Sequence, residues 1–494
     1  MNRDKETVGK VVVGMGWLTL SSIITTVVRL LITIIISRLL NAEEIGVVAS
    51  IQIIISFAEI FWMLGITQAI IQKQDLTKKD INTGFLINLC LGALIYLVLF
   101  VFSNSLAIYL GIENSDMIKV LSLVFVFHSI SGLSEALLFK NLNFKILSII
   151  DLLDVLIYGI SATLFAYFGY GAWSLVYSMI IQSVFRMILL LIFSPIKLSL
   201  KFSLSSFKKL IFFGSGYTLS RLLNNLANQG DYLVVNRNLG NIQLGYYNRA
   251  YKILMVPTNL FGQVLEKILF PFMSLYQDRK EKLNYALTHI LYTLAIFSFP
   301  ISAISFIMAD DLVLLILGPN WENVIIPFKI LILSLFFRIA YKISDSLIQS
   351  LGKVYLRTYI QFLYAAMVIL GSLYAVKWGL LGISISVAIS ISINFFITIL
   401  VIKKLTNYKA LPLFLDIFIV FILNIFISIG AYYFKDFINS VDSSFLRFLV
   451  LTIGYFLLYI VGLWFYYKFI FSNDYKEFLS IFFKSLLNKI KRKD

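Results

Sequence analysis

The stretch RLLNAEEIG, from Arg38 to Gly46, returns later in the chain as RNLGNIQLG, from Arg237 to Gly245. Each copy stands at the end of a long apolar segment, and arginine, leucine and glycine recur at the same spacing. With one or two residues of slippage the match extends upstream, pairing Gly14, Gly16, Trp17 and Ser21 with Gly214, Gly216, Tyr217 and Ser220. Internal duplication of a spanning bundle is typical of transporters, so the repeat predicts a duplicated membrane bundle.

Composition decides the class of protein. The chain has 494 residues, of which 60% are hydrophobic, 16% aromatic and only 14% charged. A water-soluble core cannot hide that much apolar surface, so we predict an all-α polytopic membrane protein. The net charge of +16 would ordinarily suggest a nucleic-acid partner. The placement of the Lys and Arg residues indicates membrane topology instead, and we expect no nucleic acid.

The apolar runs predict about fourteen transmembrane helices of the length that a bilayer requires. They cover residues 11–37, 46–71, 83–109, 118–138, 147–168, 172–194, 210–236, 244–272, 284–308, 325–350, 358–376, 380–402, 412–434 and 446–467. The first run is too long for a signal peptide and lacks a small-residue cleavage site, so we interpret it as an uncleaved span.

Basic residues concentrate in the connecting segments that lie on the same side of the membrane as the N-terminus. They are sparse in the loops on the other side. By the positive-inside rule, this asymmetry places both termini in the cytoplasm. An even number of spans in each repeat gives the two copies one orientation. We therefore expect two six-helix lobes related by a pseudo-two-fold axis along the membrane normal.

The predicted domains follow from these spans. Residues 1–195 form the N-lobe, 196–209 a basic cytoplasmic linker and 210–403 the C-lobe. Residues 404–472 hold two further spans without a repeat partner. Residues 473–494 read as a basic amphipathic helix that lies on the cytoplasmic membrane surface.

Catalytic and metal chemistry find little support in the sequence. Cys90 is the only cysteine and lies within a span, so neither a disulfide framework nor a cysteine metal site can form. His128 and His289 lie in different spans, and we expect both to be packed bundle residues. The outer loops are too short for a catalytic domain, and Asp310 and Asp311 in the longest of them read as rim charges. We predict a transporter without metal, cofactor or catalytic residues.

Acidic residues and many basic ones also fall inside the predicted spans. The acids are Glu59, Glu135, Asp151, Asp154, Asp231, Glu266, Asp345 and Asp416. A charged side chain that faces lipid at a helix centre costs about 3 kcal/mol. We therefore expect these charges to face an interior.

Polar residues recur on one face of three predicted helices, at steps of three or four residues. These stripes are Ser22, Thr26, Arg29 and Thr33; Arg221, Asn225, Asn228 and Asp231; and Arg338, Lys342, Asp345 and Gln349. Converging stripes favour a water-filled chamber. The alternative is that the charges pair with one another, such as Lys342 with Asp345, and fasten the helices together. A chamber rich in arginine favours an anionic cargo, because guanidinium groups match phosphate or carboxylate oxygens.

Short motifs follow one another along the first twelve predicted spans. They are Arg38-Leu39-Leu40 with Gly46, Gly65 with Ala69-Ile70-Ile71-Gln72, Gly171-Ala172-Trp173-Ser174-Leu175-Val176, Leu244-Gly245-Tyr246-Tyr247-Asn248-Arg249-Ala250, Leu269-Phe270-Pro271, and Leu317-Gly318-Pro319-Asn320-Trp321. In this order the chain resembles the multidrug, oligosaccharidyl-lipid and polysaccharide exporter superfamily, in particular the polysaccharide flippases of the Wzx and teichuronic acid export type.

The resemblance implies a lobed transporter in the bacterial cytoplasmic membrane that moves an undecaprenyl-diphosphate-linked oligosaccharide to the outer leaflet by alternating access. It also implies a polysaccharide polymerase and glycosyltransferases as partners. The chain departs from the family pattern at Ala42, where proline is common, and at Met63, where an acid is common. Glu59, one helical turn before Met63, is a candidate replacement for that acid.

From the stripes and the resemblance together we predict five diphosphate contacts and three counter-charges or coupling groups. The contacts are Arg29, Arg221, Arg249, Lys252 and Arg338, and the counter-charges are Glu59, Asp231 and Asp345. Whether a proton, a sodium ion or the membrane potential alone drives transport stays open.

Three alternatives remain at this stage. A multidrug or cation antiporter of the same superfamily favours an acid-dominated chamber. A lipid II flippase shares the fold and the cationic cavity and differs only in the family motifs. A membrane-embedded polysaccharide polymerase needs a large outer domain or a clustered acid pair beside an arginine.

Overall fold

The computed structural model describes residues 2–63, 65–73, 75–194, 201–275, 279–438 and 443–469. Within these ranges the regular structure is helical throughout. Helices suit a membrane chain because every backbone N–H and C=O in the bilayer must find its partner inside the protein. The predicted amphipathic helix at 473–494 and part of the predicted linker, residues 196–200, lie outside the described residues.

In the described residues before the long helix α10, the structure has nine helices. They are α1 (Asn2–Leu39), α2 (Ala42–Met63), α3 (Ile66–Gln72), α4 (Lys78–Val101), α5 (Ser103–Leu110), α6 (Asp116–Ser122), α7 (Val124–Lys140), α8 (Phe144–Tyr167) and α9 (Ala172–Phe193). The rest comprises α10 (Leu204–Leu275), α11 (Lys280–Ile307), α12 (Ala309–Leu317), η1 (Pro319–Val324), α13 (Ile325–Leu333), α14 (Leu335–Ser350), α15 (Val354–Ala375), η2 (Val376–Trp378), α16 (Gly379–Thr406), α17 (Ala410–Ile438) and α18 (Ser444–Phe469).

Within the described ranges, ten helical segments are long and apolar enough to cross a membrane, or eleven if the bent pair α13 and α14 is one span. The chain is therefore a multi-pass α-helical membrane protein. This count treats residues 355–406 as one segment, although it contains both α15 and α16. The count of fourteen stays a prediction, because the polar helix α10 is not identified as a span by length and apolarity.

Helix α10 contains both the seventh and the eighth predicted spans, and it folds back on itself. Its backbone leaves helical geometry at Gly240, where φ is 83°, a conformation that favours glycine. The Tyr247 hydroxyl donates to the Asp231 carboxylate at 2.8 Å, although sixteen residues separate them. In a straight helix that separation would be about 24 Å. The two arms of α10 therefore pack against each other.

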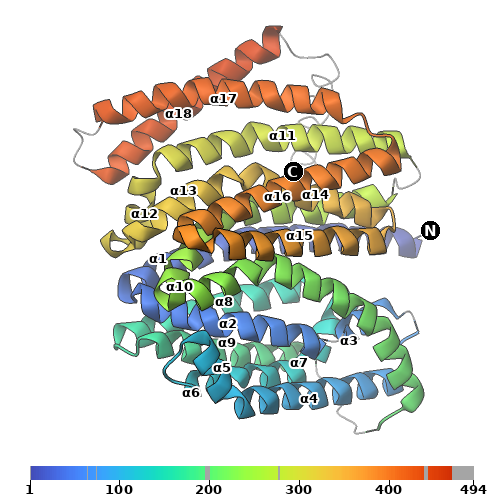
Figure 1. Cartoon of the computed structure of the whole chain (residues 1–494). Coiled ribbons are helices and arrows are strands. Elements are labelled where there is room, and N and C mark those ends of the chain that lie inside the picture. Colours follow the sequence, from blue (N-terminus) through green and yellow to red (C-terminus); the bar gives the residue numbers. More distant parts are fainter. Residues whose placement is uncertain are drawn as a thin grey trace, which may run out of the picture.

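Figure 1 shows how the chain is arranged around α1 and α10. The blue and teal helices α2 to α9 occupy the lower part of the view, and the yellow to red helices α11 to α18 the upper part. Helix α1 contacts both α8 and α12, and α10 contacts α2, α14 and α15. These two helices therefore join the two parts of the molecule. The symmetry of whole lobes and the domain boundaries stay predictions.

The two copies of the repeated motif meet each other. A Cβ atom on Gly46 would collide with the carbonyl oxygen of Asn241, and one on Gly245 would collide with that of Ala42. Ala42 and Asn241 hold equivalent places in the two copies, so the contact is reciprocal, as expected near a two-fold axis. Glycine is required at both positions because the backbones touch. The repeated spacing therefore marks the contact between α2 and the second arm of α10.

The exterior is more apolar than the surface of a soluble protein, and the interior contains polar groups as well as a hydrophobic core. Large apolar side chains are exposed on the outside, among them Leu94, Leu97, Phe426, Leu457 and Trp464. Buried residues include many serines and the charged Asp231, Arg249 and Arg338. An apolar exterior suits lipid contact, and polar groups inside can bind one another or a cargo.

Ion pairs tie the last two helices to the rest of the bundle. Asp310 on α12 lies 3.0 Å from the Lys329 ammonium of α13 and 3.3 Å from that of Lys435 on α17, while Asp311 lies 3.0 Å from Arg447 on α18. Partial burial raises the pKa of Asp310, but the two ammonium groups outweigh it and hold this pKa below its ordinary value. Asp310 and Asp311, predicted as rim charges, thus link α12 to α13, α17 and α18 through ion pairs. The segment that carries them is helical.

Candidate functional site: a cationic cavity

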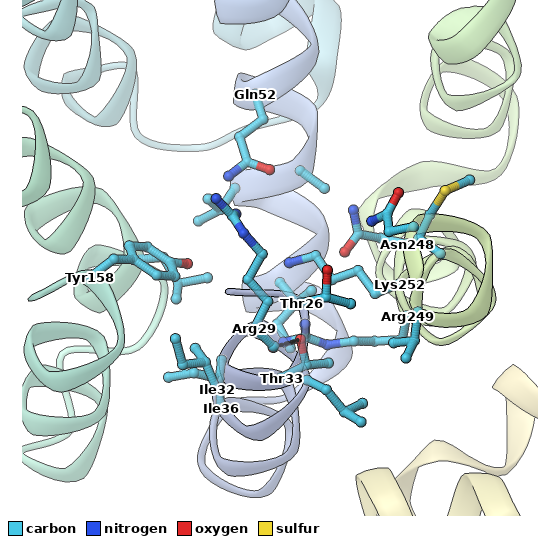
Figure 2. Close-up of a pocket in the computed structure, with 18 residues that line it drawn as sticks. Thr26, Arg29, Ile32, Thr33, Ile36, Gln52, Tyr158, Asn248, Arg249 and Lys252 are labelled. Atoms are coloured by element: carbon cyan, nitrogen blue, oxygen red, sulfur yellow. Dashed lines mark hydrogen bonds between the residues drawn. The ribbon is translucent and has the colours of Figure 1, made fainter. Parts of the chain in front are cut away.

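A cavity of about 220 Å³ lies where α1, α2, α8 and α10 meet. Figure 2 shows Arg29 of α1 in its middle, Gln52 of α2 and Tyr158 of α8 at its sides, and Lys252 of α10 directed toward it. Helix α10 also contributes Asn248. The cavity therefore lies between the N-terminal helices and α10.

Three cations line this cavity, and none of its described lining residues is Asp or Glu. Arg249 and Lys252 lie on one face of α10 because they are three residues apart, and Arg29 lies one turn after Thr26. Arg29 and Lys252 have exposed side chains, as expected for groups that extend into an open space. The structure thus brings together three of the five predicted contacts.

Arg249 is the most unusual of the three because it is buried. Only 1% of the residue is exposed, its guanidinium carbon lies 5.7 Å from the centre of the Trp321 ring, and its Nε has no hydrogen-bond partner among the described residues. No carboxylate in the described chain forms an ion pair with it. A buried cation without a counter-charge is costly. An anion in the cavity would offset that cost.

Arg338 lies in an adjoining cavity of about 430 Å³ that shares Gln52, Asn248 and Lys252 with the first. Its guanidinium donates to the Tyr251 hydroxyl at 3.3 Å and lies over the Tyr251 ring at 5.0 Å. Tyr251 in turn donates to Asp231 at 2.9 Å. The predicted counter-charge Asp231 therefore reaches Arg338 through a tyrosine.

The other predicted residues lie elsewhere. Arg221 and Glu59 line a separate cavity of about 470 Å³, together with His128, Glu135 and Arg186. Asp345 forms an ion pair with Arg357 at 2.8 Å, so its partner is neither Lys342 nor one of the predicted contacts. The roles of Arg221, Glu59 and Asp345 stay predictions.

Sequence reasoning missed the carboxylate cluster around Arg186 on α9. Its guanidinium lies 2.9 Å from Glu135, 2.9 Å from Asp151 and 3.7 Å from Asp154. Gln182, one turn before Arg186, donates to Asp154 at 2.8 Å. The i, i+4 spacing of Gln182 and Arg186, opposite two acids at i, i+3, was the available signal. Part of this cluster borders a cavity of about 520 Å³ that also contains Arg29.

The cationic cavity is closed at the end where α1 meets α2. The Asn236 amide donates to Ser50 at 2.8 Å and to the Asn241 side chain at 2.8 Å, beside the Gly46–Gly245 contact. At the same end, Trp321 donates to the Ser37 carbonyl at 2.7 Å. Contacts between segments far apart in the chain therefore seal this end.

Metal and thiol chemistry have no visible centre in the described part of the chain. No three or more His, Cys, Asp and Glu residues there are grouped so that they could hold a metal ion. His128 lies beside Trp62, His289 is buried beside Tyr285, and Cys90 is exposed.

Comparisons with known proteins agree with this arrangement. A family model described as "Polysaccharide biosynthesis protein" matches residues 35–326. Lipopolysaccharide biosynthesis protein WzxC of Escherichia coli (strain K12) is 24% identical over 402 residues, which cover 80% of this chain and 81% of that protein. Succinoglycan biosynthesis transport protein ExoT of Rhizobium meliloti (strain 1021) is 25% identical over 308 residues, 62% of each chain.

The fold has a solved counterpart. The structure of lipid II flippase MurJ in an inward closed conformation matches with a TM-score of 0.77 at 14% identity, covering 91% of this chain and 98% of that chain. At this identity the likeness concerns the fold alone.

Proposed function

Because the chain belongs to the polysaccharide biosynthesis protein family, we propose that it is a flippase for an undecaprenyl-diphosphate-linked oligosaccharide. The observation that carries the proposal is the acid-free cavity lined by Arg29, Arg249 and Lys252. A diphosphate supplies the negative charge and the several acceptor oxygens that guanidinium and ammonium groups bind best. The relatives named for lipopolysaccharide and succinoglycan biosynthesis support a saccharide cargo.

A lipid-linked cargo also needs an apolar path, and α14 offers one. Its Phe336 and Phe337 border an apolar cavity of about 640 Å³ between α11, α14, α16 and α17. Arg338 and Lys342, on the same helix, border the polar cavity. One helix thus separates a surface for a hydrocarbon chain from a surface for a charged head group.

The sealed end supports alternating access. The Gly46–Gly245 contact closes one end of the cavity, and the loops at that end are the outer ones if both termini are cytoplasmic. We infer that this state faces inward, and that the cargo leaves when this contact opens. The membrane is then the bacterial cytoplasmic membrane, and no bond is made or broken.

The alternatives differ in the charge that they need. A cation or multidrug antiporter requires carboxylates where the cargo sits, whereas Asp151 and Asp154, which border a neighbouring cavity with Arg29, form ion pairs with Arg186. A lipid II flippase would use the same diphosphate chemistry, and it differs in the sugars attached. Transport of a common diphosphate probe carrying different sugars separates these two.

The proposal is tested with purified protein in liposomes and a fluorescent polyprenyl-diphosphate-linked disaccharide. A membrane-impermeant quencher reports the arrival of this probe in the outer leaflet. Arg249→Ala removes charged hydrogen bonds that contribute about 1.5–3 kcal/mol, so transport should fall by roughly ten- to a hundredfold. Arg249→Lys should restore part of the rate. Arg279→Ala, an exposed arginine before α11, is the matched control. Equal rates for Arg249→Ala and wild type would contradict the proposal.

A further inference from the structure

The cavity of about 430 Å³ beside the cationic one has a different chemistry. Its lining includes the four side-chain amides of Gln52, Asn228, Gln229 and Asn248, and no Asp or Glu among the described residues. Tyr232, Tyr251 and Tyr341 also line it. Its volume falls in the range of about 300–1,000 Å³ that is typical of small-molecule sites. We propose that this amide- and tyrosine-lined cavity binds the first sugar of the cargo, the sugar attached to the diphosphate.

Side-chain amides suit sugar hydroxyl groups. A hydroxyl both donates and accepts hydrogen bonds, and an amide offers two donors and an acceptor on one rigid plane. A tyrosine presents a flat apolar face to the C–H groups of a pyranose and a hydroxyl at its edge. Lys252, Arg338 and Lys342 also line this cavity, as expected beside an anion, and Arg338 donates to the Tyr251 hydroxyl. The lining therefore favours a polyhydroxylated group next to an anion.

Several of these amides are held in place but keep hydrogen-bonding capacity. The Gln229 oxygen accepts from Ser56 at 2.9 Å, which leaves its NH₂ group available. Gln52 makes one weak contact, donating to the Met179 sulfur at 3.6 Å. Asn248 makes no side-chain hydrogen bond to a described residue. Neither Gln52 nor Asn248 therefore forms a strong hydrogen bond to another helix that a sugar hydroxyl would have to replace.

Position supports the same assignment. Gln52, Asn248 and Lys252 border both cavities, and Figure 2 shows these three side chains around the cationic cavity. A sugar joined to a diphosphate through its anomeric oxygen must lie directly beside the phosphates. Phosphates bound by Arg29, Arg249 and Lys252 would thus place the first pyranose among the amides.

The inference rests on the proposed function, and one binding experiment separates the two. Purified full-length protein in detergent is titrated with bare farnesyl diphosphate and with farnesyl diphosphate carrying glucose, galactose or N-acetylglucosamine. We expect at least one glycosylated probe to bind about tenfold more tightly than the bare one, the gain from one or two neutral hydrogen bonds. If none of the three binds more tightly than the bare diphosphate, the sugar site is overturned.

The decisive variant is Asn228→Ala, because Asn228 borders the sugar cavity and not the cationic one. Its amide donates to the Asn224 carbonyl one turn earlier, so its removal breaks no contact between helices. The ratio of glycosylated to bare affinity should fall about fivefold. Asn238→Ala is the matched control, since Asn238 is exposed on the same helix and donates to Val234 one turn earlier.

The outcomes are distinguishable. An unchanged affinity ratio in Asn228→Ala overturns the sugar site while leaving the diphosphate site untouched. A bare diphosphate that binds wild type and Arg249→Ala equally overturns the proposed function itself. A ratio that falls in Asn228→Ala and holds in Asn238→Ala supports the sugar site.

Discussion

Two charged regions lie close together in this bundle and are organised in opposite ways. Around Arg186 one guanidinium has three carboxylates within 3.7 Å, all on α7 and α8. In the neighbouring cavity, Arg29, Arg249 and Lys252 come from α1 and α10 and have no carboxylate among the lining residues. In the first region the cation has carboxylate partners in excess, whereas in the second the cations have none among the lining residues.

Arginine thus serves helix packing in one region and ligand binding in the other. A cation surrounded by acids stabilises the contact of α7, α8 and α9, and it need not change when the cargo arrives. A set of unpaired cations between two parts of the bundle is costly alone. That cost is removed only when an anion binds. The cavity lined by Arg29, Arg249 and Lys252 is therefore the region that we expect to bind the cargo.

The largest expected effect comes from making the cavity resemble the Arg186 cluster. Arg249→Glu places a carboxylate beside Arg29 and Lys252, where it would pair with them and repel a diphosphate. Affinity for bare farnesyl diphosphate should fall by about a hundredfold or more, as measured by titration of the purified protein. Retained affinity would mean that the cavity is not the diphosphate site.

Removing the cation from the carboxylate cluster should affect the stability of the fold more than the binding of the diphosphate. Arg186→Ala leaves Glu135, Asp151 and Asp154 without their partner, so we expect a loss of about 1–3 kcal/mol, limited because two of the carboxylates are partly exposed. Thermal unfolding in detergent measures this loss. Adding Asp151→Asn should recover part of it, because one repulsive charge is removed. A variant as stable as wild type would show that the cluster does not fasten the helices.

How much of this comparison the sequence predicts depends on the kind of contact. Arg29, Arg249 and Lys252 were predicted because stripes of polar residues on apolar helices must face an interior. The repeated spacing predicted a duplicated bundle and marked Gly46 and Gly245 as equivalent positions, but their contact is seen only in the structure. Both signals are local or periodic, and periodicity survives in a linear sequence.

Pairings between helices could not be predicted in the same way. Asp345 pairs with Arg357, and Asp231 reaches Arg338 through Tyr251, because of how the helices are rotated and bent. The break at Gly240 decides that Asp231 meets Tyr247, and one glycine in a polar helix is a weak signal. Which of several acids pairs with a given arginine is decided by tertiary packing.

A third prediction concerns the sealed end. The pair Gly46→Ala and Gly245→Ala introduces methyl groups that collide with backbone, so α2 and α10 must separate there. In a Cys90→Ser, Ala49→Cys background, the new thiol should react several times faster with a membrane-impermeant maleimide than it does without the two glycine substitutions. Gly454→Ala, where the added methyl group meets open space, should leave this rate unchanged. Equal rates in all variants would contradict the role of this contact as a gate.

The smallest expected effect belongs to the ion pairs of Asp310. Its depressed pKa means that the ionised carboxylate stabilises the fold at pH values above the unfolded pKa of about 3.9, and this contribution is lost as the pH falls through the folded pKa. Asp310→Asn should therefore lower the melting temperature slightly at neutral pH. The difference from wild type should shrink on acidification. A difference that grows at low pH would reverse the assigned sign.

The position of the bound diphosphate separates the cationic cavity from every other charged region of the bundle. An experimental structure of the protein with farnesyl-diphosphate-linked N-acetylglucosamine tests this directly. We predict phosphate oxygens within about 2.7–3.2 Å of nitrogen atoms on Arg29, Arg249 and Lys252, with Arg186 still bound to its three carboxylates. Phosphates bound at Arg186 or Arg221, with the acid-free cavity empty, would contradict the account.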